Sequence, residues 1–264
     1  MIYHICNEPL TDGYYQYAWD NRMFESHLHK DDVHCYSCTA FTKKEHELSD
    51  GRVLCKRCYG TVVKPGDSIE KIKSFVINAL YNAGFNDLYL DDITYEIVTA
   101  KKMAEIQKTP VNLQNKGYTV SNINTSTLYG IRTSQKCRHT IYMLTHLTKE
   151  EFAGTLAHEM LHVWQTQNSV NMSHKNKEGF CNMGTYLVYS SMSGTFTKIQ
   201  LKNLHESKDM IYGDCFREMY SHFERLGWKK LIENVRRKGI MGKYFPHVNQ
   251  LYSRVQTLAN SVKF

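Results

Sequence analysis

The sequence of 264 residues lacks the features that would place it in a membrane or in a secretory pathway. No stretch approaches the roughly 18 to 20 uninterrupted apolar residues that a membrane helix needs. The first residues do not have the basic-then-apolar layout of a secretory signal. The chain also contains no internal repeat and no low-complexity tract. We therefore expect a cytoplasmic, globular protein that has no membrane partner.

Positive charge is in excess but is not concentrated in one segment. The formal net charge of +7 and the pI near 8.8 would suit an acidic partner such as nucleic acid. However, the lysines and arginines are scattered, and only short clusters such as 229–230 and 236–238 stand out. Such clusters are typical of solvated helix faces. We therefore do not expect nucleic acid as a partner.

The eight cysteines are unevenly distributed, and four of them form two C-x-x-C pairs near the N-terminus. Cys35 and Cys38 make the first pair, Cys55 and Cys58 the second, and sixteen residues separate the pairs. In a chain without an export signal this spacing favours zinc over disulfides. A module this small has little core, so metal would supply much of its stability. We interpret residues 1–62 as a module with one structural zinc on these four thiolates.

A turn-rich joint at residues 64–67 separates this module from a second predicted domain over residues 66–264. Ser68 is expected to cap a helix whose apolar residues recur at helical spacing. Residues 93–99 alternate in the manner of a strand, and residues 140–144 form another apolar run bounded by polar residues. We interpret residues 140–144 as an edge strand that could hold an extended substrate by β-addition.

From Thr148 the pattern becomes helical, because Thr148 and Glu151 match a capping box that precedes a helically spaced apolar series. The predicted helices are 148–167, 178–192, 208–226, 229–237 and 248–262. The predicted fold class is therefore α+β, with a twisted, mostly antiparallel sheet of a few strands beside the helix 148–167 and a helical C-terminal part.

The central motif is H-E-x-x-H, formed by His158, Glu159 and His162 within the predicted helix. Two histidines four residues apart lie on one helix face, so both imidazoles can bind a single zinc ion. Glu159 is placed to take a proton from a zinc-bound water. Apolar residues surround the motif, and burying these polar groups would be costly without metal or partners. Core histidines bonded to backbone carbonyls are the alternative interpretation.

A catalytic zinc needs a third protein ligand and an open position for water. Fifteen residues separate His162 from Glu178, which begins a predicted apolar helix and could fold back onto the metal. His174, Cys181 and Asp214 are the alternatives. We prefer Glu178 because of this position and because a carboxylate keeps the zinc-bound water reactive. Cys181 is then interpreted as a small core residue.

This ligand set predicts a zinc metallopeptidase that attacks a peptide carbonyl with water activated by Glu159. The developing oxyanion usually needs a second donor besides zinc. Tyr212 and Arg217 are the candidates for that donor. Asp214 is a candidate partner for a zinc-bound histidine. For these three residues a purely structural role is the competing interpretation.

The N-terminal module resembles a LIM domain. His29 and Asp32 precede the first C-x-x-C pair at three-residue steps, and Cys6 matches the second cysteine of the opening LIM pair. The second LIM zinc site, made of four cysteines, is complete. The first has lost one cysteine and carries Asp32 in place of another, so a second structural zinc would need a substitute ligand such as His4 or His27.

A LIM-like module joined to H-E-M-L-H resembles the plant organ-size-regulating LIM peptidases, the DA-one family. The resemblance rests on the motif 158–162, on residues 178–181, and on residues 212–217 with the segment 228–239 that follows. It implies a gluzincin-type zinc endopeptidase, with a zincin-type domain, that cleaves selected intracellular proteins. Plant members also respond to ubiquitin through acidic helices ahead of the LIM domain. No such helix is visible here, which weakens the case for ubiquitin or ubiquitinated proteins as partners.

Two other functions compete with this interpretation. A SprT-like protease acting on DNA-bound proteins would also combine H-E-x-x-H with a zinc module, but its third ligand is a histidine and its zinc module follows the protease domain. A non-catalytic LIM interaction scaffold is the alternative from another class. The intact Glu159 argues against the scaffold, because a peptidase domain that has lost its activity usually lacks the general base.

Overall fold

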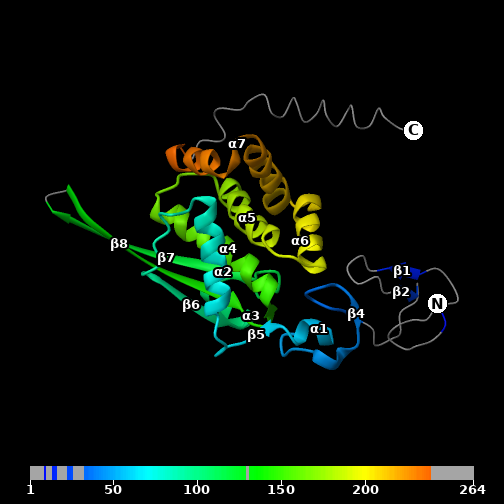
Figure 1. The fold of residues 1–264 in the computed structure, drawn as a ribbon. Coiled ribbons are helices and arrows are strands. Elements are labelled where there is room, and N and C mark those ends of the chain that lie inside the picture. The colour runs from blue at the N-terminus through cyan, green and yellow to red at the C-terminus, as the bar shows by residue number, and fades with distance from the viewer. Residues whose placement is uncertain (1–8, 10–13, 17–22, 26–32, 129–130, 239–264) are drawn as a thin grey trace, which may run out of the picture.

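The structure is a computed structural model that describes residues 9, 14–16, 23–25, 33–128 and 131–238. Several predictions lie outside this part of the chain: the candidate ligands Cys6, His29 and Asp32, the substitute ligands His4 and His27, and the helix at 248–262. Within the described residues, helices and small sheets form a mixed α+β fold (Figure 1). No helix in this part is long and apolar enough to cross a membrane.

The N-terminal region consists of short hairpins and turns. Strand β1 (Tyr14–Gln16) pairs with β2 (Met23–Glu25), and β3 (Val33–His34) pairs with β4 (Phe41–Thr42). The 3-10 helix η1 (Lys44–His46), helix α1 (Lys56–Tyr59) and strand β5 (Val62–Val63) follow. This region has a small core of its own around the cysteines, which Phe196 from a later helix completes.

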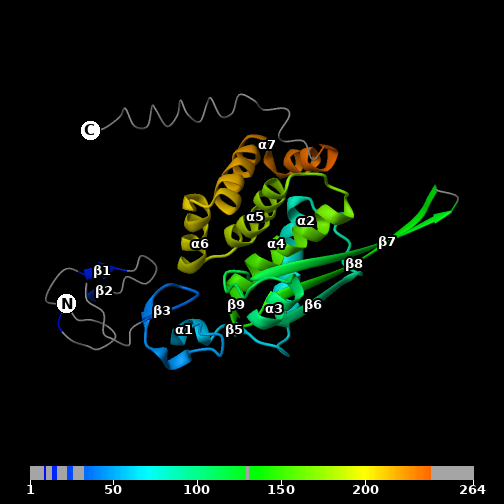
Figure 2. The ribbon, with the colours of Figure 1, turned by 180° about the vertical axis from the view of Figure 1, so that it is seen from behind.

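The main sheet has three strands in the order β6-β8-β7: β6 (Ile93–Val98), β7 (Gly117–Leu128) and β8 (Ile131–Leu144). Strand β6 runs parallel to β8, whereas β7 is antiparallel to it. The expectation of an edge strand at residues 140–144 was wrong, because these residues belong to β8 and pair on both sides. The β7–β8 hairpin extends well beyond the helical body (Figure 2).

Helix α4 (Lys149–Gln167) packs against the sheet and carries the H-E-x-x-H motif. The predicted capping box is confirmed, because the Thr148 hydroxyl accepts from the Glu151 amide and the Glu151 carboxylate accepts from the Thr148 amide. The structure corrects the cap of helix α2 (Glu70–Ala83), which begins after Ile69 and not at Ser68. Helix α3 (Ala100–Gln107) connects β6 to β7.

The remaining helices pack on the side of α4 away from the sheet (Figures 1 and 2). Helix α5 (His174–Ser190) lies along α4, and the core between them is aromatic, with Trp164 and Phe180 both fully buried. After α6 (Thr195–Glu206), the π-helical turn η2 (Met210–Asp214) leads into α7 (Cys215–Lys238). The predicted break between helices 208–226 and 229–237 corresponds to a kink in α7 at Gly227, whose φ is +72°.

The N-terminal region is joined to the sheet-and-helix body by strand pairing. Strand β5 pairs with β9 (Leu147–Thr148), the two residues that immediately precede α4. Val63 of β5 belongs to the main hydrophobic core. The start of the motif helix is therefore held by a segment from the N-terminal region.

Candidate active site

The two motif histidines converge because α4 presents them on one face, one turn apart. The Nε2 atoms of His158 and His162 lie 3.2 Å apart. Both side chains are mostly buried, with 13% and 23% of their surface exposed. Both residues line the same cleft.

Glu178 reaches the same point from helix α5. Its carboxylate oxygens lie 3.2 Å from Nε2 of His158 and 3.4 Å from Nε2 of His162. Burial alone would raise the pKa of Glu178, but hydrogen bonds from the two histidines hold that pKa well below its ordinary value. Glu178 is therefore an ionised carboxylate directed at both imidazoles. His174, one turn earlier on α5, lies 3.6 Å from this carboxylate and is mostly exposed.

The opposite edges of both imidazoles contact Cys181 and Asn182, which lie one turn after Glu178 on α5. Nδ1 of His158 lies 2.9 Å from Oδ1 of Asn182, and Nδ1 of His162 lies 3.4 Å from Sγ of Cys181. Asn182 in turn donates to the backbone carbonyl of Tyr212. Burial raises the pKa of the Cys181 thiol to about 11. Each Nδ1 atom thus has a partner on α5, and the Nε2 edge of each ring is turned toward Glu178.

Two groups of side chains in the described part of the chain could hold a metal ion: the four N-terminal cysteines, and His158 with His162 and Cys181. In the second group, Cys181 approaches His162 at Nδ1, whereas Glu178 approaches it at Nε2. The two candidate third ligands therefore lie on opposite edges of the same imidazole ring.

Glu159 is buried, with 5% of its surface exposed, and its carboxylate lies against strand β7. The Thr119 hydroxyl lies 2.7 Å from Glu159 Oε2, to which it can donate. Gly117 leaves the space that the carboxylate occupies, because a Cβ at this position would lie 2.6 Å from Glu159 Oε1. Strand β7 therefore fixes the orientation of Glu159.

A cleft of about 660 Å³ surrounds these side chains. One wall is strand β7, which contributes Gly117, Thr119 and Ser121, and the other is formed by α4 and the start of α5. Within the described strands, β7 has a neighbour on one side only, so its other edge carries backbone groups without a strand partner.

The two candidates for the oxyanion donor lie in different places. Tyr212 lines the cleft and is 49% exposed. Arg217 is not among the lining residues. Its guanidinium donates to the carbonyls of His205 and Ser207 and pairs with Asp214. Arg217 and Asp214 thus brace the turn that precedes α7, and the structure does not bring Asp214 to the histidines as a ligand.

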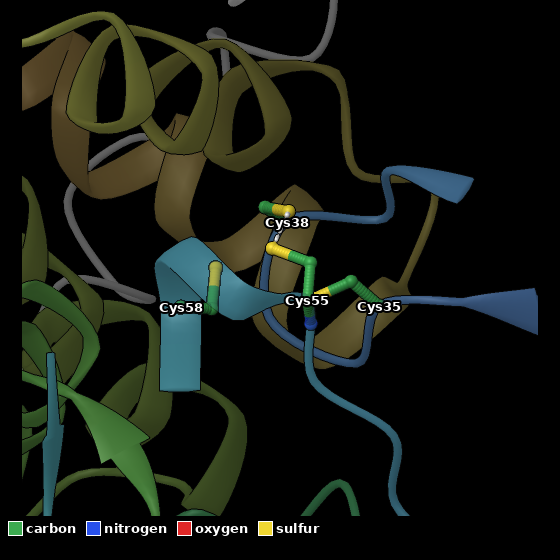
Figure 3. Close-up of side chains that lie close together, drawn as sticks. All are labelled: Cys35, Cys38, Cys55 and Cys58. Atoms are coloured by element: carbon green, nitrogen blue, oxygen red, sulfur yellow. Dashed lines mark hydrogen bonds between the residues drawn. The ribbon is translucent and has the colours of Figure 1, made fainter. Parts of the chain in front are cut away.

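The second candidate site consists of Cys35, Cys38, Cys55 and Cys58, whose side chains lie close together in Figure 3. All four are buried and none forms a disulfide. Tetrahedral zinc with Zn–S bonds of about 2.3 Å holds its sulfurs about 3.8 Å apart. The Sγ atoms of Cys38 and Cys55 are 3.7 Å apart, which fits this geometry. Hydrogen bonding with Cys38 lowers the pKa of Cys35 to about 7, so this thiol ionises readily.

Sequence reasoning missed three residues of the site: Thr119, Gly117 and Asn182. None of them belongs to the H-E-x-x-H motif, and strand β7 was not predicted at all. The only signal for Asn182 was its position on the face of α5 that also carries Glu178. Comparison with known protein families, curated proteins and solved structures found no match to this chain.

Proposed function

We propose that this protein is a zinc-dependent endopeptidase that hydrolyses peptide bonds in selected protein substrates. The observation that carries the proposal is the convergence of three groups: the Nε2 atoms of His158 and His162 lie 3.2 Å apart, and the Glu178 carboxylate places Oε2 3.2 Å from the first and Oε1 3.4 Å from the second. Three ligands at about 2.0 to 2.1 Å from a tetrahedral zinc lie about 3.3 Å apart. The spacing of these atoms therefore fits one zinc ion.

Glu178 is a better third ligand than Cys181 for two reasons. Its ionised carboxylate faces the Nε2 atoms of both histidines, whereas the Cys181 thiol contacts His162 at Nδ1. A zinc-bound histidine usually gives its other N–H to a neighbouring acceptor, and Cys181 and Asn182 supply such acceptors. The sequence-based choice of Glu178 is thus supported by the ring edges that each candidate contacts.

When bound, the zinc would lower the pKa of a water molecule and polarise the substrate carbonyl. Glu159 would accept the proton from the attacking water and pass it to the leaving amine. The hydrogen bond from Thr119 and the space at Gly117 keep one carboxylate oxygen of Glu159 oriented during this transfer. Tyr212 is the better candidate for donating to the developing oxyanion, because it lines the cleft and Arg217 does not.

The substrate would bind as an extended strand along the outer edge of β7. Residues of β7 alternate along the cleft wall, and backbone pairing at a free edge gives affinity with little dependence on sequence. The outer edge of β7 thus takes the substrate-binding role that the sequence suggested for residues 140–144, because those residues lie in the centre of the sheet. The substrates would be proteins with a flexible segment, and we place the activity in the cytoplasm. Membership of the DA-one family and a LIM-like identity of the N-terminal module belong to the same proposal.

The test compares cleavage of an unstructured protein such as casein by the native protein and by Glu159→Gln, with zinc content measured in both. Loss of a general base lowers the rate about 10²- to 10⁴-fold. Glu150→Gln is the matched control, because it makes the same chemical change on the same helix outside the cleft. Equal absence of cleavage in all three proteins would exclude the peptidase and favour the interaction scaffold.

A further inference from the structure

The first C-x-x-C pair inserts its two middle residues into the sheet-and-helix body. Between Cys35 and Cys38 stand Tyr36 and Ser37, and both contact residues far along the chain. The Tyr36 hydroxyl donates to the carbonyl of Leu113 in the segment that leads into β7. The Ser37 hydroxyl donates to the Glu151 carboxylate over 2.5 Å. This loop of the proposed metal site therefore contacts two segments of the proposed catalytic domain, the segment before β7 and the first turn of α4.

Glu151 is the centre of these contacts, and only 1% of its surface is exposed. Besides Ser37, its carboxylate accepts from the backbone amide and the hydroxyl of Thr148, at 3.2 and 3.0 Å. Lys116 completes the set, with Nζ 2.9 Å from the other carboxylate oxygen. One buried charge thus joins the cysteine loop, the first turn of α4 and the residue before β7.

Both segments lead to the general base. Gly117 directly follows Lys116 and is the residue whose missing side chain leaves room for the Glu159 carboxylate. Glu159 itself lies eight residues after Glu151 on α4, about 12 Å along the helix axis at 1.5 Å per residue. The Lys116 carbonyl also accepts from the Leu144 amide, which fixes the start of β7 on β8. A displacement of Glu151 would therefore move both the helix and the strand that flank Glu159.

Apart from these contacts, backbone hydrogen bonds hold the loop, among them one from the Tyr36 amide to the Val53 carbonyl. Turn hydrogen bonds join the Cys35 amide to the Ala40 carbonyl and the Thr39 amide to the Cys35 carbonyl, and Thr39 has a φ of +60°. The core of this region is small, and the four cysteines make up half of its eight buried residues. A module with so little apolar core depends on a bound metal for its conformation.

We propose that Ser37, acting through Glu151 and Lys116, positions Glu159. Metal on the four cysteines is therefore required for an ordered catalytic cleft, although the two metal sites share no ligand. This rests on the proposed peptidase function. Ser37, Glu151 and Lys116 are positioning residues, because none of them touches the substrate or the zinc site that contains the histidines.

The first experiment compares Ser37→Ala with Ser49→Ala, an exposed serine of the same region. Kinetics on an unstructured protein, zinc content and hydrogen exchange are measured for each. For Ser37→Ala we expect about a tenfold fall in kcat with KM within twofold, since a hydrogen bond to a buried charge is lost. Zinc content stays native, and exchange quickens selectively in the first turn of α4 and at the start of β7. Ser49→Ala behaves as native. Native kcat in Ser37→Ala, or exchange that quickens throughout the molecule, would overturn the proposal.

Two further variants change the groups at the two ends of this network, Lys116 beside β7 and a cysteine of the metal site. Lys116→Met leaves the hydrogen bond between Ser37 and Glu151 in place, removes the cation–π contact of Lys116 with the Tyr36 ring, and is expected to reproduce the kcat defect. Combining it with Ser37→Ala should lower kcat by less than the product of the two single effects. Cys58→Ser is expected to lower zinc by one per chain, to quicken exchange at the start of α4 and to lower kcat. Loss of one zinc with native kcat and native exchange would refute the coupling. If the native protein cleaves nothing, the exchange measurements still decide the coupling, while the peptidase proposal alone fails.

Discussion

Replacing Glu151 by glutamine changes one atom of the buried network and removes its charge. The glutamine amide can still accept from Ser37 and Thr148, but its NH2 group faces Lys116, which is itself a donor. Breaking a fully buried ion pair costs about 3 to 5 kcal/mol. The Lys116 side chain is 32% exposed, so water can solvate it in the variant. We therefore expect a loss of about 2 to 3 kcal/mol, nearer the value for hydrogen bonds to charged groups.

The pH dependence of this loss follows from the pKa of Glu151. Burial alone would raise that pKa, but Lys116 and the Ser37 hydroxyl lower it below its ordinary value of 4.5. A carboxylate whose pKa is lower in the folded state stabilises the fold above its ordinary pKa and loses this contribution as the pH falls through the folded-state pKa. The free energy of unfolding of the native protein should thus exceed that of Glu151→Gln by the full amount at pH 7. The difference between the two proteins should shrink below about pH 4.5.

Urea unfolding of the two proteins across this pH range is the assay. With an m-value of about 3 kcal/mol/M, the midpoint should fall by about 0.7 to 1 M at pH 7. Acid also releases zinc, so the difference between variants at each pH is the relevant quantity. Glu150→Gln, the neighbouring change, should stay within about 0.5 kcal/mol of native. A difference between native and Glu151→Gln that is constant from pH 7 to pH 3 would refute the reasoning.

Three further predictions concern the cleft. Gly117→Ala should displace the Glu159 carboxylate and lower kcat at least tenfold with native zinc content, measured by steady-state kinetics and metal analysis. In chelator competition, Cys181→Ala should weaken zinc binding about 10- to 100-fold without abolishing it. Glu178→Gln should lose the metal at concentrations where Cys181→Ala keeps it, and the reverse order would make the thiol the third ligand. Tyr212→Phe should lower kcat about 10²-fold with little change in KM, and native kcat would remove Tyr212 from the mechanism.

The parts of the fold that sequence reasoning predicted best depend on interactions within one segment. The capping box of Thr148 and Glu151 determines where α4 begins, and the four-residue spacing of the histidines is a property of any helix. Both are local, so both could be read from the pattern. Ser68 shows the limit of such reasoning, because a good capping residue lies two positions ahead of the helix that forms.

The parts that could not be predicted depend on pairing between distant segments. Residues 140–144 have the apolar pattern of a strand whether they lie at an edge or in the centre. Their place in the centre is decided by β6 and β7, which pair with β8 on its two sides. The partners of Glu159 were missed for the same reason. No sequence pattern predicts the contacts of Ser37 and Lys116 with Glu151, because these contacts span 114 and 35 residues of sequence.

Central to the proposed function is a zinc ion held by His158, His162 and Glu178, separate from the one on the four cysteines. Zinc per chain, measured by elemental analysis after gel filtration, tests this claim most directly when the native protein and His158→Ala are compared. We predict that His158→Ala contains one zinc fewer than the native protein and keeps the metal of the N-terminal region. An identical zinc content in the two proteins would contradict it.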